Sequence, residues 1–179
     1  YALVSGEKLT PEMVHAMLVS DPGAAREAYI LGSLLQRSEG GTLSTELWTQ
    51  CLNISERFRP DILLESIKGG DVESALRQYG PIDYVGCVNC ADRLSKVPEL
   101  RQRILLKAES LWPAWSQPLT PAKAMMRAQQ LALSDGTQCV SWLSKALGEW
   151  PENAELRIMK AIQLETLGRN SEAYDEWLT

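Results

Sequence analysis

Residues 151–177 decide the fold class, and they read PENAELRIMKAIQLETLGRNSEAYDEW. The opening residues Pro151, Glu152 and Asn153 are typical of a helix start, and the apolar side chains that follow recur every three or four positions. Gly168-Arg169-Asn170 interrupts this pattern as a turn, and a second helical segment begins at Ser171. The stretch therefore predicts two antiparallel helices joined by a short turn.

The preceding segment repeats this organisation. Thr120-Pro121 pairs a hydroxyl cap with a proline at the first helical position, and the predicted helix runs to about Ser134. Asp135-Gly136-Thr137 predicts a turn, and a second helix follows that ends near Trp150-Pro151. A shift of about 34 residues superposes the two segments, and it pairs Leu133 with Leu167, Cys139 with Ala173 and Leu143 with Trp177.

Residues 151–177 resemble the tetratricopeptide repeat family, whose period is about 34 residues. The small, turn, close-packing and aromatic positions of that repeat fall here on Ala161, Gly168, Ala173 and Trp177. The late small position and the terminal proline of the preceding unit fall on Ala146 and Pro151. Three residues depart from the family pattern, because a charge stands where an apolar or small residue is usual: Arg127, Arg157 and Lys160.

The first third of the chain resembles a degenerate copy of the same repeat. Leu31-Gly32 matches the family's Leu-Gly pair, and Leu35 follows on the same face. After Gly40-Gly41, a second predicted helix carries Trp48 and Cys51 at the aromatic and small positions. Ser44 stands where the family prefers alanine.

The middle of the chain is the least regular part. A short helix is predicted from Pro60 to Lys68, and a turn and second helix from Gly70 to Tyr79. Residues 82–95 stay ambiguous. A strong helix is predicted from Val97 to Leu111, closed by Trp112-Pro113-Ala114-Trp115. With a further helix from Thr10 to about Ser20, the expected segments are 1–21 (N-terminal helix), 22–57 (degenerate repeat), 58–116 (irregular helical pairs), 117–151 (repeat) and 152–179 (truncated repeat).

We therefore expect an all-α fold, a right-handed stack of antiparallel helix pairs whose concave face is lined by the first helix of each pair. The resemblance implies a scaffold or adaptor that binds a protein or peptide partner on this concave face. The family's groove positions fall on Arg26, Tyr29, Ile30, Ser33, Arg37, Met125, Ala128, Leu131, Ile158, Met159 and Ile162. The family's clamp for peptide tails, built from Lys, Asn and Arg, is absent, so heat-shock chaperone tails are not the expected partners.

Charge and composition narrow the classes of partner. The net charge is −5, and Lys and Arg are scattered singly, so nucleic acid is not an expected partner. No apolar run approaches the roughly 20 residues that span a bilayer, and no signal peptide is present, so membrane insertion of this fragment is not expected. The chain begins at Tyr1 and ends at Thr179 inside a predicted helix, which indicates a piece of a longer protein. We expect a soluble domain, in the cytoplasm in preference to the periplasm or another oxidising compartment.

Cys87-Val88-Asn89-Cys90 is the motif most suggestive of chemistry. A Cys-x-x-Cys pair serves as a redox dithiol or as half of a zinc site, and in an oxidising compartment it can form a disulfide. The redox interpretation needs a preceding strand, which Tyr84-Val85-Gly86 does not resemble. The zinc interpretation needs further ligands, yet Cys51 and Cys139 occupy small-residue positions that predict burial. We expect the pair to be structural or incidental, with no zinc and no cofactor.

No catalytic pattern emerges from the remaining residues. His15 is the single histidine, and Gly40-Gly41 and Gly69-Gly70 lack the features of a phosphate-binding loop. The chain is therefore not expected to be an enzyme, although it could be the helical accessory domain of a larger enzyme or regulator. Trp112 and Trp115 flank Pro113 and predict either a plug between helix pairs, which we favour, or a platform for a sugar or peptide.

Overall fold

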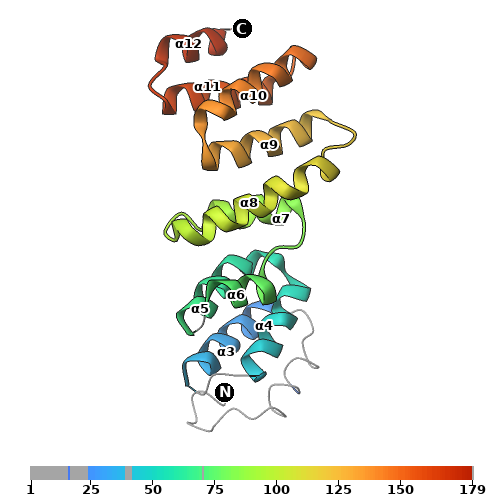
Figure 1. The fold of residues 1–179 in the computed structure, drawn as a ribbon, viewed down its shortest axis with the longest axis vertical. Coiled ribbons are helices and arrows are strands. Elements are labelled where there is room, and N and C mark those ends of the chain that lie inside the picture. The colour runs from blue at the N-terminus through green and yellow to red at the C-terminus, as the bar shows by residue number, and fades with distance from the viewer. Residues whose placement is uncertain (1–15, 17–23, 39–41, 70, 179) are drawn as a thin grey trace. The chain divides into compact units, whose positions relative to one another are not determined.

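A computed structural model describes residues 16, 24–38, 42–69 and 71–178 of the chain (Figure 1). Over these residues the chain is all-helical and contains no strand, which confirms the predicted all-α class. It divides into two compact units, Tyr1–Gly80 and Pro81–Thr179. The boundary falls inside the predicted segment 58–116, which therefore contributes to both units. The helix predicted from Thr10 to about Ser20 lies outside the described residues, apart from Ala16.

The first unit consists of two helical hairpins. Helix α3 (Ala25–Ser38) packs on α4 (Thr42–Ile54), and α5 (Arg59–Gly69) packs on α6 (Val72–Tyr79), with the 3-10 turn η1 (Glu56–Phe58) between the hairpins. All four helices lie where the sequence predicts helices.

Gly32 and Trp48 set the spacing of the first hairpin. Trp48 is 1% exposed, and a Cβ atom placed on Gly32 would lie 2.6 Å from the Cδ1 and Nε1 atoms of its ring. The ring also meets the edge of Tyr79 at 5.5 Å between centroids. The hydroxyl of Tyr79 in turn donates a hydrogen bond to the Thr45 hydroxyl oxygen at 3.2 Å. The absent side chain at residue 32 thus lets an indole fill the space between α3 and α4.

Arg59, at the start of α5, bonds the carboxyl end of α6 and so links the two helices of the second hairpin. The residue is 7% exposed, and its Nη1 donates hydrogen bonds to the carbonyl oxygens of Tyr79 at 2.6 Å and Gly80 at 3.1 Å. Its Nε and Nη2 donate to the carboxylate of Glu56. A cation thus satisfies the carbonyls at the carboxyl end of α6, where the helix dipole is negative.

The second unit consists of three hairpins that follow one another in the chain. They are α7 (Tyr84–Arg93) with α8 (Pro98–Trp115), α9 (Pro121–Ser134) with α10 (Gly136–Glu149), and α11 (Ala154–Thr166) with α12 (Asn170–Leu178). The first helix of each hairpin contacts the first helix of the next, α7 against α9 and α9 against α11 (Figure 1). Successive first helices therefore form one layer of this unit.

Side-chain caps set the helix boundaries that the sequence predicts. The side chains of Thr120, Asp135 and Asn153 each accept a hydrogen bond from a backbone N–H in the first turn of α9, α10 and α11, respectively. Gly168 adopts a left-handed conformation with φ of +74°, and the Arg169 N–H bonds the Leu164 carbonyl at 2.8 Å. This geometry ends α11 at a glycine, as the turn pattern predicts.

Small residues let α9 and α10 approach closely. The core of this hairpin contains Ala124, Ala128, Leu131, Cys139, Leu143 and Ala146, all buried, and Leu156 of α11 joins the same cluster. The Cys139 thiol lies 3.2 Å from the carbonyl oxygen of Ala128, as a buried Sγ–H donor. Ala161 and Ala173 are likewise buried between α11 and α12. Burial at these positions confirms the predicted role of small residues in helix packing.

The three charged departures from the repeat pattern each have a local partner. Arg127 forms an ion pair with Glu109 at 2.6 Å, which joins α9 to α8. Lys160 pairs with Glu176 at 2.6 Å and joins α11 to α12. Arg157 donates to the carbonyl oxygen of Pro151 at 2.6 Å, just before its own helix. Charge thus replaces apolar contact at these positions.

The structure assigns one segment that the sequence left ambiguous and corrects two local expectations. Residues 84–93 of the ambiguous segment form a helix, α7, capped by the Asp83 carboxylate that accepts from the Gly86 N–H at 2.7 Å. Helix α8 continues to Trp115 instead of ending near Leu111, although Pro113 within it has no N–H to donate to the preceding turn. Trp177, expected at a packing position, is 47% exposed and donates its indole N–H to Glu165 at 2.9 Å.

Among the described helices, none combines the length and the hydropathy that a bilayer crossing demands.

Candidate partner-binding groove

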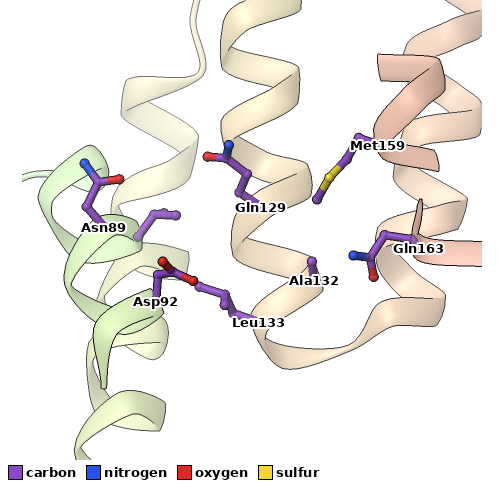
Figure 2. Close-up of a pocket in the computed structure, with 8 residues that line it drawn as sticks. Asn89, Asp92, Gln129, Ala132, Leu133, Met159 and Gln163 are labelled. Atoms are coloured by element: carbon purple, nitrogen blue, oxygen red, sulfur yellow. The ribbon is translucent and has the colours of Figure 1, made fainter. Parts of the chain in front are cut away.

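The first helices of the three hairpins in the second unit, α7, α9 and α11, line a groove of about 410 Å³. Figure 2 shows the side chains that surround it, projecting from all three helices. In chain order they are Val88, Asn89, Asp92, Gln129, Ala132, Leu133, Met159 and Gln163. The groove therefore crosses the layer that the first helices form.

Each of the three helices contributes one side-chain carboxamide to this groove. These are Asn89 from α7, Gln129 from α9 and Gln163 from α11 (Figure 2). A carboxamide carries an acceptor oxygen and two N–H donors, so it can bond both the carbonyl and the N–H of a peptide backbone. Asn89 and Gln129 are exposed, which leaves these groups accessible to a partner.

The rest of the lining is mainly apolar. Ala132 and Leu133 of α9 are half-buried, and so is Met159 of α11, whose flexible thioether adapts to irregular surfaces. Asp92 is the one charged residue among the lining residues, and neither Lys nor Arg lines the groove. The groove thus combines apolar surface and neutral amides with one carboxylate.

Four aromatic rings hold the helices around the groove in place. Tyr84 of α7 stacks on Trp115 of α8 at 4.5 Å between centroids and lies 5.3 Å from Trp112. Trp112 meets the edge of Trp142 of α10 at 5.7 Å, and the Trp142 indole N–H donates to the Ala124 carbonyl of α9 at 2.9 Å. Trp112 and Trp115 therefore pack between hairpins, as the favoured plug interpretation predicts.

A polar network lies beside the rings. Arg127 donates two hydrogen bonds to the carboxylate of Glu109, at 2.6 and 2.8 Å, and its guanidinium lies 5.0 Å from the centre of the Trp112 ring. The amide oxygen of Gln130, a residue only 2% exposed, accepts from the Tyr84 hydroxyl and from Arg127, each at 2.7 Å. The network joins α7, α8 and α9.

Ionisation in this network follows from burial and hydrogen bonding. The hydrogen bonds from Arg127 hold the pKa of the Glu109 carboxyl below its usual value, although partial burial opposes this. Burial raises the pKa of the Tyr84 hydroxyl to about 12, so this group donates to Gln130 as a neutral phenol. Both groups therefore keep one protonation state near neutral pH.

The predicted contact residues of the second unit divide into accessible and buried ones. Met159 lines the groove, Ile158 and Ile162 are exposed on α11, and Met125 packs against the hairpin core. Ala128 and Leu131 are corrected, because they are 0% and 6% exposed inside the α9–α10 core and cannot meet a partner while the hairpin is closed.

The predicted contact residues of the first unit lie on α3, and most have partners within that unit. Tyr29 stacks on Phe58 at 5.4 Å, and Arg37 pairs with Glu65 of α5 at 2.9 Å. Ser33 is corrected, because it is buried and its hydroxyl donates to its own helix, to the Tyr29 carbonyl at 2.9 Å. Arg26 and Ile30 are exposed.

Sequence reasoning missed the amides and Asp92. A usable signal was present, because Gln129 and Gln163 are 34 positions apart, which is the period that the sequence predicts. Met125 and Met159 have the same separation and were recognised because they are apolar. The family's groove positions did not fall on these amides, and α7 lies in the segment that the sequence left ambiguous.

The four cysteines of the chain are all buried thiols. Cys87 and Cys90 lie within α7, not at its amino end, and no strand precedes them among the described residues. Burial raises the pKa of Cys51 and of Cys139 to about 11, which disfavours the reactive thiolate. In the described part of the chain, no three His, Cys, Asp or Glu side chains gather as a metal site would need.

Comparisons with known proteins found no match: no family model fits the sequence, and no curated protein or solved structure is detectably similar to the chain.

Proposed function

We propose that this chain is a helical-repeat interaction domain that binds an extended segment of a partner protein in the groove of α7, α9 and α11. The observation that carries this proposal is the placement of Asn89, Gln129 and Gln163 on three successive first helices around one groove. An extended peptide presents backbone donors and acceptors along its length, and regularly placed carboxamides complement them. The right-handed sense of the helical stack stays a prediction.

The groove also favours one class of peptide by charge. Asp92 attracts a cationic side chain, while neither Lys nor Arg lines the groove to hold a carboxylate. The whole chain carries a net charge of −5, which adds weak attraction for basic segments. The preferred ligand is therefore a neutral or basic segment with an apolar residue for the surface around Leu133 and Met159.

Selection from a random peptide library tests this function directly. We expect selected peptides to contain Lys or Arg more often than Asp or Glu, and we expect one such peptide, once synthesised, to bind the full chain. The double variant Asn89→Ala with Gln129→Ala should weaken its binding by about thirtyfold, since each amide contributes about 1 kcal/mol as a net hydrogen bond.

The chain offers a matched control for this variant. Asn53 and Gln78 are exposed amides of the first unit, outside the groove, so Asn53→Ala with Gln78→Ala should leave the affinity unchanged. All four substituted residues are exposed, so neither variant should disturb the fold. Equal affinity of the groove variant and the control variant for the selected peptides would show that the amides do not form the binding site.

A further inference from the structure

The lining of the groove follows a pattern that recurs from helix to helix. Apart from the buried Val88 and the small Ala132, each of α7, α9 and α11 contributes one carboxamide and one larger side chain. The larger side chains are those of Asp92 on α7, Leu133 on α9 and Met159 on α11 (Figure 2). Each is three or four positions from the amide of its own helix, so the two lie on one face, a turn apart.

The spacing of the three helices selects the conformation of a ligand that crosses them. Helix α7 packs against α9 and α9 against α11, and helices in direct contact have axes about 8–10 Å apart. A β-strand returns its side chains to the same face every two residues, a repeat of about 6.6 Å. A polyproline II helix returns them every three residues, a repeat of about 9.3 Å. The polyproline II repeat therefore matches the step from one first helix to the next, and the β repeat does not.

The carboxamides suit a polyproline II backbone. This conformation has no hydrogen bonds within its own chain, so its N–H and carbonyl groups are available to a partner. Asn89 and Gln129 are exposed, and a carboxamide can donate to a carbonyl and accept from an N–H. Because each amide carries both kinds of group, it can bond a segment that crosses the groove in either chain direction.

Asp92, Leu133 and Met159 would then meet ligand side chains that are three residues apart. Asp92 is exposed, and its carboxylate complements a Lys or Arg side chain. Leu133 and Met159 are half-buried and present apolar surface, which complements aliphatic side chains. One face of the ligand would thus carry a cation, an aliphatic side chain and a second aliphatic side chain, in this order.

We infer that the groove binds a polyproline II segment of a partner protein that carries one basic and two aliphatic residues, each three positions from the next. The inference rests on the proposed function and adds the ligand's conformation and its order of side chains. Asp92 contacts the basic residue, Leu133 the middle aliphatic residue and Met159 the outer one. Charge complementarity to Asp92, within a chain of net charge −5, selects the basic residue.

The test compares three blocked peptides of identical composition on the full chain. The spaced peptide is acetyl-Lys-Pro-Ala-Leu-Pro-Ala-Leu-amide, and its reversal is acetyl-Leu-Ala-Pro-Leu-Ala-Pro-Lys-amide. The permuted peptide, acetyl-Lys-Pro-Leu-Ala-Leu-Pro-Ala-amide, places the same side chains at every second position. We expect the tighter of the two spaced peptides to bind about tenfold more tightly than the permuted one, because permutation removes one leucine from apolar contact.

Nuclear magnetic resonance measures which ligand side chain meets which helix. On titration with the tighter spaced peptide, the methyl resonances of both Leu133 and Met159 should shift. Replacing the outer leucine of that peptide by serine should abolish the shift of Met159 and retain that of Leu133. The change is made in the peptide, so the fold of the protein is untouched.

The contribution of Asp92 is measured against a matched control. Asp92→Asn removes the carboxylate at nearly constant size and should weaken binding of the spaced peptide about threefold, as for an exposed ion pair. Asp92→Lys should instead favour a spaced peptide with Glu in place of Lys. Glu149→Gln removes an exposed carboxylate from the same unit, outside the groove, and should leave the affinity unchanged. Far-ultraviolet circular dichroism verifies that each variant is folded.

Three results would overturn the inference. They are equal affinity for the spaced and permuted peptides, equal affinity of Asp92→Asn and Glu149→Gln for the spaced peptide, and a shift of Met159 that survives replacement of the outer leucine.

The amide variant Asn89→Ala with Gln129→Ala separates this inference from the proposed function. If spaced and permuted peptides bind the unmodified chain equally and this variant weakens both, the groove binds peptides, and only the conformation and the order of side chains are wrong. If none of the three peptides binds, the inference is wrong, and selection from the random library decides the proposed function by itself.

Discussion

In the first unit a single indole ring, that of Trp48, fills the space between two helices, whereas in the second unit four rings and a polar network share that task. Trp48 lies directly against Gly32 and Tyr79. The second unit distributes the corresponding contacts over Tyr84, Trp112 and their neighbours. The difference predicts that the first unit is sensitive to one position, while the second tolerates more single changes.

The largest expected effect is that of Trp48→Ala. Removing a buried tryptophan that is 1% exposed leaves a cavity that should destabilise the first unit by about 3–5 kcal/mol. Hydrogen exchange read by mass spectrometry should show faster exchange of α3 and α4 amides, with the amides of α9 to α11 unchanged. As a control, Trp177→Ala removes a ring that is 47% exposed and should have a much smaller effect. Equal acceleration in both units would refute this comparison.

A matched pair of glycine substitutions gives the next effect. A Cβ on Gly32 would lie 2.6 Å from the Trp48 ring, so Gly32→Ala should destabilise the first unit by about 1–3 kcal/mol. A Cβ on Gly148 of α10 meets nothing within 4 Å, so Gly148→Ala should stabilise the second unit by up to about 1 kcal/mol, the difference in helix propensity between the two residues. Denaturant unfolding measures the change in free energy of unfolding for both variants, and we expect the two changes to have opposite signs. If Gly32→Ala left the free energy of unfolding unchanged, the Trp48 ring would be able to shift away from the added methyl group.

Arg127→Met tests the polar network of the second unit. The substitution leaves the buried amide of Gln130 without one of its donors and removes the two bonds to Glu109. We expect a loss of about 1–3 kcal/mol, smaller than that of Trp48→Ala because the rings remain. Urea unfolding measures this loss of free energy of unfolding. The control is Arg169→Met, which removes a surface ion pair with Glu172 and should change the free energy of unfolding little. A loss as large as that of Trp48→Ala would show that the second unit also depends on one residue.

The smallest effect is expected from pH. In the folded chain the pKa of Glu109 is lowered by Arg127, so the pair contributes stability that is present above the unfolded pKa of about 4.3 and is lost as the pH falls through the folded value. The melting temperature should therefore decrease less between neutral and acidic pH for Glu109→Gln than for the unmodified chain. Because the Glu109 side chain is 53% exposed, the difference should be small. If the melting temperatures of the two proteins decreased equally with pH, the pair would contribute no stability, because solvent screens it.

The helices of the second unit could be predicted well where their caps are local. Thr120, Asn153 and Gly168 mark boundaries through bonds to their own first or last turn, and the structure places the boundaries there. Helix α7 was not predicted, because Gly86 and Cys-x-x-Cys give a weak helical pattern. Burial of Tyr84, Cys87 and Cys90 against α8 provides the stability that propensity lacks.

The candidate site was predicted only in part. Periodicity identified α9 and α11, and the family resemblance identified Met159, which lines the groove. The resemblance also assigned Ala128 and Leu131 to the concave face, although both are buried in the stripe that α9 turns to the core. The separation of 34 positions could have linked Gln129 to Gln163. Asn89 could be added to them only after the three helices were placed side by side, because no local rule distinguishes a groove amide from any other exposed amide.

The sequence by itself determined the all-helical class, the helix boundaries set by caps and glycine, and the burial of small residues at repeat spacing, because these depend on interactions within one or two turns of chain. Only the tertiary structure decided which polar groups meet. Asn89, Gln129 and Gln163 come to one groove, and Arg101 is left with a buried donor, through the packing of helices distant in sequence. Such packing depends on shape complementarity between side chains that no local pattern encodes.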